Sequence, residues 1–354
     1  MTSSPRDVKL CLLGFGNVAR SFCALLERQA PLLAEKHGLR VLVTGAGTRR
    51  GSLLAPDGMA PGAVLAAAPK GAPLPAPPRP ADQLLAASGA DVLVELTVME
   101  EDFAPLATGH IEAAFDLGMD VVTANKGPIA WNWSRISKKA ASTGRRIRFE
   151  STVMDGLPVF SLLEFTLVDC RLLGFEAVFN STTSVILDAI GRGESFEGAL
   201  GAAQDAGIAE ADPSHDIDGW DAACKAAALA NVAMDAGITP ADVVKESLRD
   251  VHRERIVKAR ADGKRLRLVT TVWREGDEAG GAAASGSPAG PVRARVRAAE
   301  LDIDHPLAPL TEESLGVVLH TDLMGDVVVA ELGALVPQTA YGVYADLLHV
   351  CRPA

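Results

Sequence analysis

VKLCLLGFGNVA, at residues 8–19, joins an apolar run to a glycine-rich turn and then to a helical pattern. Gly14 and Gly16 permit a tight turn and a close approach of the backbone to a pyrophosphate, and the small Ala19 takes the place of a third glycine. The first amides of the following helix would add hydrogen-bond donors and the positive end of a helix dipole. These features predict a dinucleotide-binding turn, with a plain strand-to-helix turn as the alternative, formed by Gly14, Phe15, Gly16, Asn17, Val18 and Ala19.

Residues 1–150 alternate short apolar runs with stretches whose apolar residues recur at helical spacing. This alternation is typical of a parallel sheet with helical crossovers, so the fold class predicted here is α/β, of the Rossmann type. Residues 55–80 are rich in Ala, Pro and Gly and indicate a long, loosely structured connection. The predicted strands are Val8–Leu13, Arg40–Thr44, Asp91–Glu95, Asp120–Thr123 and Arg146–Glu150, and the predicted helices are Val18–Lys36, Phe103–Leu117 and Ile129–Ser142.

After Glu150 the runs become longer and more strand-like, which indicates a second domain of the α+β class. A length of 354 residues suits two domains. We expect a dinucleotide-binding domain over 1–150, joined by 333–354, and a substrate-binding and dimerisation domain over 151–332. Residues 278–291 indicate a flexible hairpin tip. The strands predicted here are Gly174–Phe179, Leu266–Val272, Val292–Ala298, Val317–Thr321 and Val327–Leu332, with helices at Phe196–Ala206 and Gly219–Ala236.

Composition and charge exclude several classes of protein. With 48% hydrophobic and 22% charged residues, the chain is neither disordered nor fibrous. A net charge of -11 has the wrong sign for a nucleic-acid binder. Because no apolar run approaches the ~20 residues of a membrane span and no signal peptide is evident, we expect a cytoplasmic protein without a membrane partner. No CxxC spacing suggests a zinc or redox site, so we interpret as buried small hydrophobes Cys11, Cys23, Cys170, Cys224 and Cys351.

The end of the second predicted strand bears on the choice of cofactor. An acidic residue there would bind the adenosine ribose and favour NAD, but none occurs between Glu35 and Asp57. Arg49 and Arg50 follow the strand instead, and guanidinium groups suit a 2′-phosphate. The sequence therefore favours NADP, with NAD as the second choice and two solvated loop arginines as the alternative interpretation.

Two further segments carry polar groups suited to chemistry. Lys126 follows the predicted strand 120–123, and ligands bind at the carboxyl ends of strands in open α/β sheets. Asp221 and Lys225 are four residues apart and share one face of a predicted helix, after an acidic run over 210–218. A surface ion pair is the alternative interpretation of Asp221 and Lys225.

Taken together, these blocks resemble the homoserine dehydrogenase family, over nearly the whole chain. The block 210–225 is the most specific, because its Glu, three further acids, Gly and Lys stand at the family's spacing. The resemblance implies the short form, without an appended regulatory domain. The similar segments are the Gly14 turn, TANKGP at 123–128, ESTVMDGLP at 150–158, the block 210–225 and the closing stretch 333–347.

The resemblance also implies an activity: reduction of L-aspartate 4-semialdehyde to L-homoserine with NADPH or NADH, in a homodimer. Lys225 matches the proton donor, and Lys126 matches a lysine that contacts nicotinamide and substrate. Glu210, Asp216 and Asp221 match substrate-binding acids. Further matches are the cofactor contacts Thr97 and Gly207, and a sodium-binding turn with Glu150, Val153, Asp155 and Leu157 as ligands.

Several positions depart from the family's usual residues. Ser181 stands where Gly is usual, Val98 where Pro is frequent, and Leu335 where a Gly lies close to the cofactor. Two other hypotheses therefore stay open beside the homoserine dehydrogenase activity. One is a dehydrogenase of a related amino-acid semialdehyde, and the other is a non-catalytic dinucleotide-binding descendant.

Overall fold

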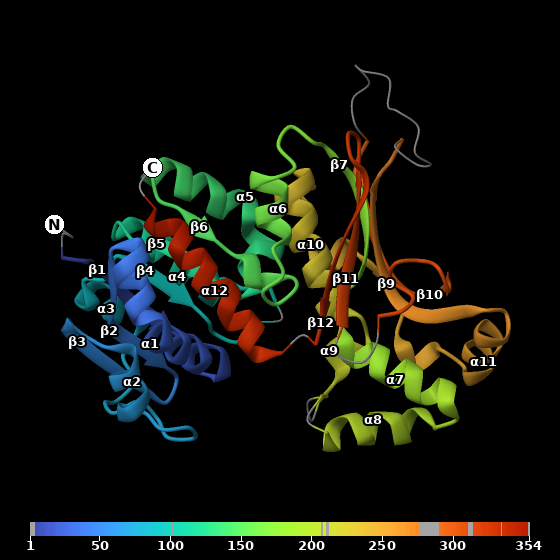
Figure 1. Ribbon diagram of the computed structural model, residues 1–354, viewed down its shortest axis with the longest axis horizontal. Coiled ribbons are helices and arrows are strands. Elements are labelled where there is room, and N and C mark those ends of the chain that lie inside the picture. The colour runs from blue at the N-terminus through green and yellow to red at the C-terminus, as the bar shows by residue number, and fades with distance from the viewer. Residues whose placement is uncertain are drawn as a thin grey trace. The chain divides into compact units, whose positions relative to one another are not determined.

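The computed structural model describes residues 4–100, 102–206, 208–209, 212–276, 290–310, 314–333 and 335–352. The chain divides into two compact units, which are drawn in Figure 1. The first unit contains Met1–Pro158 and Val336–Ala354, and the second contains Val159–Leu335. The C-terminal segment therefore belongs to the first unit, although it follows the second in sequence.

The first unit is built on one sheet. Its strands are β1 (Arg6–Leu13), β2 (Leu39–Thr48), β3 (Gly51–Met59), β4 (Val92–Glu95), β5 (Asp120–Thr123) and β6 (Ile147–Arg148). Their order in the sheet is β3-β2-β1-β4-β5-β6, as expected for a Rossmann-type fold. Neighbouring strands run parallel, except that β3 is antiparallel to β2 at one edge. The predicted fold class is thereby confirmed. The order of the strands switches direction next to β1, where a dinucleotide binds in such sheets.

Helices cover both faces of this sheet. Successive residues of its central strand point to opposite sides, so apolar side chains on both faces have to be buried. Leu10 and Leu12 face a core formed with α1 (Asn17–His37), α2 (Pro61–Ala67) and α12 (Val336–Cys351). Cys11 and Leu13 face a core formed with α3 (Ala81–Ser88), α4 (Pro105–Asp116) and α5 (Lys126–Thr143).

The prediction of a loosely structured connection over residues 55–80 is wrong for its first part. Residues 51–59 form β3, and Pro61 begins the short helix α2. Pro56 is tolerated because β3 is an edge strand, and proline fixes a backbone angle that suits the first turn of a helix. The strand predicted at 146–150 is also shorter than expected, because a 3-10 turn, η1 (Glu150–Thr152), replaces its end.

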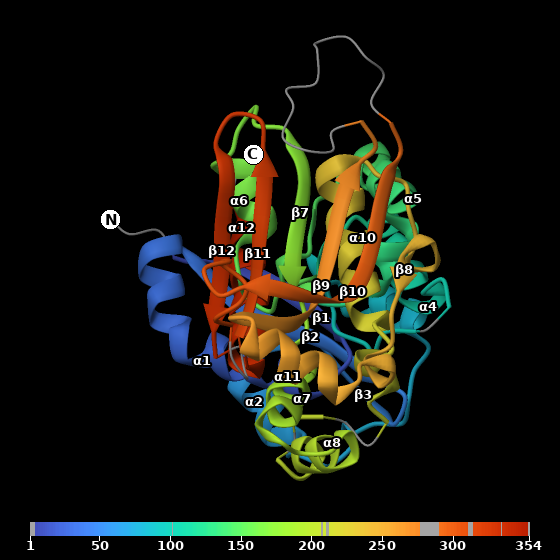
Figure 2. The ribbon, with the colours of Figure 1, turned by 90° about the vertical axis from the view of Figure 1, so that its right-hand side faces the viewer.

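The second unit has a mixed sheet. Its strands are β7 (Leu172–Val178), β8 (Val244–Lys245), β9 (Lys264–Arg274), β10 (Val292–Asp302), β11 (Ser314–Thr321) and β12 (Gly325–Leu332). Their order in the sheet is β12-β11-β7-β9-β10-β8. All neighbours are antiparallel, except β8 and β10. Figure 2 shows the long strands side by side. The antiparallel pairing of β9 with β10 agrees with a hairpin, but the predicted tip lies almost entirely outside the described residues.

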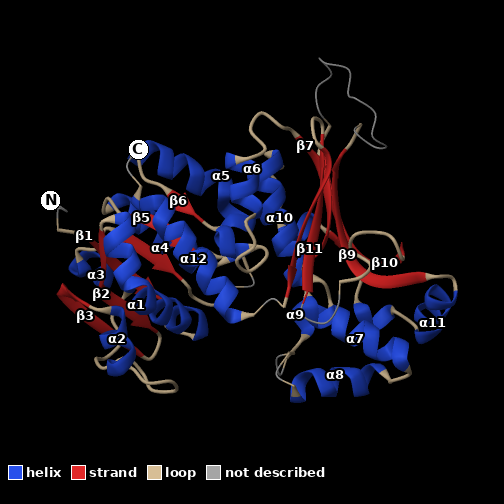
Figure 3. Cartoon of the chain, in the orientation of Figure 1, coloured by secondary structure: helices blue, strands red, loops and turns tan. Residues whose placement is uncertain are grey.

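Helices complete the second unit, as the cartoon in Figure 3 shows by colour; they are α6 (Val159–Phe165), α7 (Ser181–Arg192), α8 (Phe196–Asp205), α9 (Ser214–Ile217), α10 (Trp220–Met234) and α11 (Arg253–Ala261). Seven of the 15 residues of the long helix α10 are alanine, and the helix packs against β7, β9 and β10. This combination of mixed sheet and helices agrees with the predicted α+β class. Among the described residues, no helix is long and apolar enough to cross a membrane.

Candidate active site

The glycine-rich turn lies at the carboxyl end of β1, as predicted. Gly14 has a φ of +90°, and a Cβ atom there would lie 2.3 Å from the carbonyl oxygen of Leu96. Its amide donates to Gly47 at 2.9 Å, which holds the turn against the end of β2. Glycine is thus required at position 14 both by backbone conformation and by space.

The helix that follows the turn leaves room for an anion. Gly16 precedes α1, and a Cβ atom built on it would meet nothing within 4 Å. No side chain caps the N-terminus of α1, and its first turn contains no acidic residue. Free amides and an uncompensated helix dipole fit the pyrophosphate of a dinucleotide. Phe15 and Ala19, which belong to the same predicted turn, are both buried against the core of the unit.

A pocket of about 290 Å³ adjoins this turn and collects positive charge. Arg50, Lys70 and Arg20 line it, together with Asn17 and Thr48. Arg20 is fixed, because its guanidinium donates to the carbonyls at 68 and 69 and lies 4.9 Å from the centre of the Phe15 ring. Neither Arg50 nor Lys70 has an ion-pair partner among the described residues. Such a pocket fits a phosphate.

Arg49 is exposed on the same turn as Arg50, but it is not among the residues that line the pocket. Lys70 and Arg20 were not predicted from the sequence. Arg20 stands one residue after the glycine motif, and Lys70 comes from the connection after α2, so only the folded chain brings them to Arg50.

The ends of β4 and β5 bring a second group of polar residues together. Thr97 follows β4, and the Asn125 side chain donates to the Thr97 carbonyl oxygen at 3.2 Å. Asn125 also caps α5, because its Oδ1 accepts from the amide of Gly127 at 3.0 Å. Lys126 is the half-buried first residue of this helix. Thr97 and Lys126 therefore lie at the same edge of the sheet as the glycine turn, as predicted.

In the second unit, Lys225 and Asp221 form a close ion pair on α10. The Lys225 Nζ atom lies 2.9 Å from Asp221 Oδ2, and the two side chains are only 16% and 13% exposed. Lys225 also donates to the carbonyl oxygen of Phe179 at 2.7 Å, at the end of β7. The alternative of a solvated surface pair is thus wrong, because both side chains are largely buried.

Asn180 joins two of the predicted acids, a link that the sequence analysis missed. Its Nδ2 donates to Asp216 Oδ1 at 2.7 Å and to Asp221 Oδ2 at 3.1 Å. Its Oδ1 accepts from the Thr183 amide and so caps α7. Asn180 is 8% exposed. An Asn directly after a predicted strand and before Ser-Thr-Thr is a helix-cap signal that was available in the sequence.

Gly207 and Glu210 lie outside the described residues. Of the departures from the family pattern, Val98 is 81% exposed, Ser181 begins α7, and Leu335 is 52% exposed. Nothing in the described part of the second unit explains the choice of Ser at position 181.

The predicted sodium turn packs against α12 within the first unit. Glu150 is buried, and its amide donates to Asp346 Oδ2 at 2.8 Å. Thr339 of the same helix donates to Asp155 Oδ1 at 2.8 Å, and Asp155 has a φ of +47°. Val153 is buried and Leu157 half-buried. Among the described residues, no group of three or more His, Cys, Asp or Glu side chains could hold a metal ion, so a cation here would depend on backbone oxygens.

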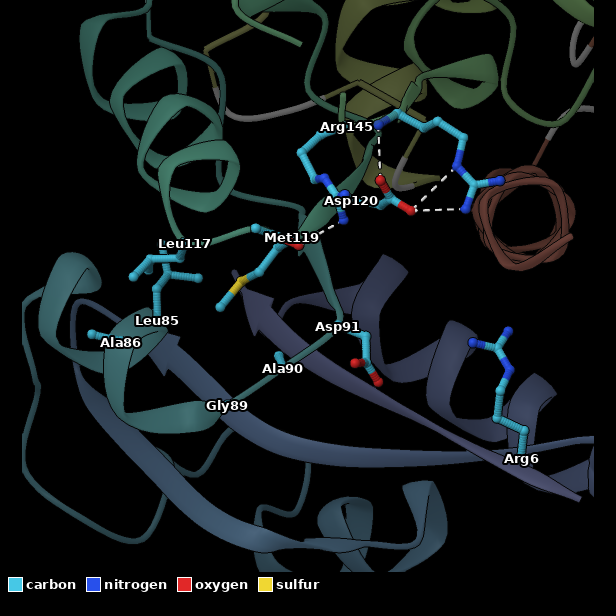
Figure 4. Close-up of a pocket in the computed structure, with 12 residues that line it drawn as sticks. Arg6, Leu85, Ala86, Gly89, Ala90, Asp91, Leu117, Met119, Asp120 and Arg145 are labelled. Carbon is cyan, nitrogen blue, oxygen red and sulfur yellow. Dashed lines mark hydrogen bonds and ion pairs between the residues drawn. The ribbon is translucent and has the colours of Figure 1, made fainter. Parts of the chain in front are cut away.

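A larger hollow, of about 530 Å³, lies where the strands of the first unit begin, at the edge opposite the glycine turn (Figure 4). Its charged side chains already form hydrogen bonds and an ion pair with groups near the ends of helices and the starts of strands. A ligand would therefore have to displace these bonds. We therefore place the candidate site at the carboxyl edge. The bonds in this hollow run from Arg146 to Asp120, from Arg6 to the carbonyl of Cys351, from Arg145 to the carbonyl of Gly118, and from the Lys9 amide to Asp91.

A Rossmann-type unit with a glycine-rich turn, together with a unit that holds a lysine against a carboxylate, fits the class of nicotinamide-dependent oxidoreductases. Comparison with known proteins narrows this class. The family model for the homoserine dehydrogenase NAD-binding domain matches residues 14–150, and that for homoserine dehydrogenase matches residues 158–348. The chain belongs to the homoserine dehydrogenase family, which confirms the resemblance seen in its sequence.

Individual relatives agree with this assignment. The chain is 32% identical to an NAD(+)-dependent homoserine dehydrogenase of Pseudomonas canavaninivorans, over 98% of this chain and 97% of the relative. It is 31% identical to a homoserine dehydrogenase of Mycobacterium leprae, over 99% of this chain and 74% of that protein. The crystal structure of a homoserine dehydrogenase from Thiobacillus denitrificans superposes with a TM-score of 0.80 at 26% identity, covering 98% of this chain and 74% of that one.

Proposed function

We propose that the protein catalyses the reversible, NADPH-dependent reduction of L-aspartate 4-semialdehyde to L-homoserine. The observation that carries this proposal is the largely buried Lys225, held between Asp221 and the carbonyl of Phe179. A lysine fixed in this way can give a proton to a carbonyl oxygen, and membership in the homoserine dehydrogenase family supports the substrate.

Lys225 is the proposed proton donor. As the aldehyde carbon is reduced, negative charge develops on its oxygen, and a positioned ammonium both stabilises this charge and protonates it. Asp221 favours the charged form of the lysine and fixes its direction. The amino group of the substrate needs carboxylate partners, and the proposed partners are Asp216, Asp221 and Glu210.

The first unit is proposed to hold the cofactor, which supplies the hydride when bound. The turn from Gly14 to Ala19 would bind the pyrophosphate, since a side chain at Gly16 would occupy open space next to free amides. Thr97, Lys126 and Gly207 are the proposed contacts of the nicotinamide end, and Lys126 is also proposed to contact the substrate.

NADP is proposed in preference to NAD. The pocket beside the turn supports a 2′-phosphate, because Arg50, Lys70 and Arg20 line it and no Asp or Glu is among the described residues of its lining. Arg49 remains a proposed contact from the same turn. The relative from Pseudomonas canavaninivorans is named for NAD(+), so the two cofactors need direct comparison.

Three further features are proposed on the strength of the family. A sodium ion would be bound by Glu150 and by backbone oxygens of Val153, Asp155 and Leu157, and the buried Glu150 is the observation that fits a cation there. It would support the turn on α12 and take no part in the reaction. A homodimer formed through the second unit and a cytoplasmic location are the other two.

The test is steady-state turnover of the purified chain with NADPH and with NADH. Substrates are L-aspartate 4-semialdehyde and a panel of other amino-acid semialdehydes, and the product is identified by mass spectrometry. We expect homoserine from aspartate semialdehyde, with a lower KM for NADPH than for NADH. If only a different semialdehyde were turned over, that semialdehyde would be the substrate in place of L-aspartate 4-semialdehyde. NADPH binding without turnover of any aldehyde would refute the enzymatic function.

A further inference from the structure

Glu95 is a charged residue at the end of β4 in the first unit. Its side chain is completely buried. Within the described residues, its carboxylate has no Lys or Arg partner, and the nearest ring nitrogen, His110 Nδ1, lies 3.5 Å away. Burying a carboxylate is costly unless it is hydrogen-bonded. The donors that face Glu95 should therefore indicate what this residue does.

Those donors belong to the predicted nicotinamide edge. Both the hydroxyl and the amide of Thr97 donate to Glu95 Oε1, the amide at 3.3 Å. The Thr123 hydroxyl lies 3.5 Å from Glu95 Oε2 and donates to the backbone carbonyl of Glu95 at 3.1 Å. Glu95 therefore organises the residues that follow β4 and β5, at the edge where Thr97 and Lys126 lie.

The direction of each hydrogen bond follows from the carboxylate. Since the single hydroxyl proton of Thr97 points to Glu95, its oxygen can only accept from Asn125, whose Nδ2 lies 3.3 Å away. The Asn125 amide nitrogen therefore points to Thr97, where it donates both to this hydroxyl and to the backbone carbonyl at 3.2 Å, and Oδ1 accepts from Gly127 at 3.0 Å. The hydrogen bonds that begin at Glu95 end at the first turn of α5.

We propose that Glu95 is a positioning residue for the nicotinamide end of the cofactor. It fixes Thr97 directly and, through Asn125, the first turn of α5, where Lys126 lies. Nothing in the reaction requires Glu95 to touch the cofactor. The inference rests on the proposed function, in which Thr97 and Lys126 contact the nicotinamide.

Two variants test this from opposite ends of one hydrogen bond: Glu95→Gln, which keeps the shape of the side chain, and Thr97→Val, which removes only the hydroxyl. The dissociation constant of NADPH is measured by fluorescence titration, without substrate. Amide hydrogen exchange is followed in peptides covering residues 121–131. We expect both variants to weaken NADPH binding by roughly tenfold, as for the loss of a hydrogen bond to a charged group, and to speed exchange in the first turn of α5.

A kinetic isotope effect separates positioning from general destabilisation. With NADPH deuterated at the transferred hydrogen, a misplaced nicotinamide makes hydride transfer slower relative to other steps, so the isotope effect on kcat rises. Thr44→Val and Ser88→Ala are matched controls, because both residues are buried in the same unit and bond to backbone carbonyls away from this edge. We expect the controls to lower the melting temperature with no change in NADPH affinity or isotope effect.

Wild-type NADPH affinity and exchange in folded Glu95→Gln and Thr97→Val would overturn the inference, as would equal losses of affinity in the two controls. If Glu95→Gln does not fold, amide exchange in the first turn of α5 of Thr97→Val, measured without NADPH, decides, because a lost cofactor contact alone would not change it. A wild-type chain that binds NADPH but does not reduce aspartate semialdehyde would refute the proposed function, and the binding and exchange measurements would still test Glu95.

Discussion

The Nζ atom of Lys225 donates to the carbonyl oxygen of Phe179 at 2.7 Å. Asp221 on α10 accepts from the same nitrogen at 2.9 Å, so two of the three ammonium N–H groups have partners, one of them the carbonyl directly after β7. This backbone carbonyl cannot move unless β7 moves as well, so the contact holds the flexible Lys225 side chain in one position. We expect the third N–H group to point to the substrate oxygen.

Asn180 should matter for substrate binding rather than for folding alone. Asn180→Ala removes the donor shared by Asp216 and Asp221, so the two carboxylates lose the amide that lies between their charges. We expect KM for the semialdehyde to rise by roughly tenfold, and kcat to fall, because a buried hydrogen bond to a charged group is lost. Steady-state kinetics at saturating NADPH measures this.

Asn231→Ala provides the matched comparison for Asn180. Asn231 is equally buried in the second unit, but its side chain bonds to the backbone of Ile238. The Asn231→Ala variant should have a lower melting temperature and a KM for the semialdehyde near the wild-type value. If both alanine variants raised KM to the same extent, the bridging role of Asn180 would be excluded.

Arg50 and Lys70 should decide between the two cofactors. The double variant Arg50→Ala, Lys70→Ala removes two cations from the pocket beside the glycine turn. We expect KM for NADPH to increase by roughly 10- to 100-fold while KM for NADH changes little, because only NADPH carries the 2′-phosphate. Lys138→Ala, an exposed lysine on α5, controls for loss of charge. Equal increases for both cofactors would contradict the assignment of this pocket.

The cysteines should differ sharply in reactivity. Burial raises the pKa of the Cys11 and Cys23 thiols to about 12 and that of Cys351 to about 11. Since the thiolate is the reactive form, these three should stay protonated and unlabelled by iodoacetamide near pH 8 in the folded protein. Cys170 is only half-buried, so the prediction that all five cysteines are buried is wrong for this residue, and we expect it to be labelled first.

Peptide mass spectrometry before and after unfolding measures that labelling. Cys170→Ser should remove the early modification and leave the other sites unchanged. Rapid labelling of Cys11 in the folded chain would show that the core of the first unit opens far more easily than its packing indicates.

The parts of the site that could be predicted from the sequence are those encoded locally. The turn from Gly14 to Ala19 combines a strand, a tight turn and a helix start within a dozen residues, and the spacing of Asp221 and Lys225 fixes their common face. The burial of this pair could not be predicted, because it depends on β7 and on Asn180, about forty positions earlier.

Contacts between distant segments explain the other differences. Lys70 joins Arg50 only because β3 turns back along β2 and α2 follows it, and the Ala, Pro and Gly content of residues 55–80 conceals both elements. The role of Glu95 was equally hidden. In sequence it ends an apolar strand and looks like a surface acid, whereas its partners come from three different segments.

The most direct test of the account compares the wild-type chain with Lys225→Met, which keeps the length of the side chain but cannot donate a proton. NADPH oxidation with L-aspartate 4-semialdehyde is followed optically, and NADPH affinity is measured separately. The account predicts homoserine formation by the wild type and a fall in kcat by about 10²- to 10⁴-fold in the variant, with unchanged NADPH affinity. Near-normal turnover by Lys225→Met would contradict it.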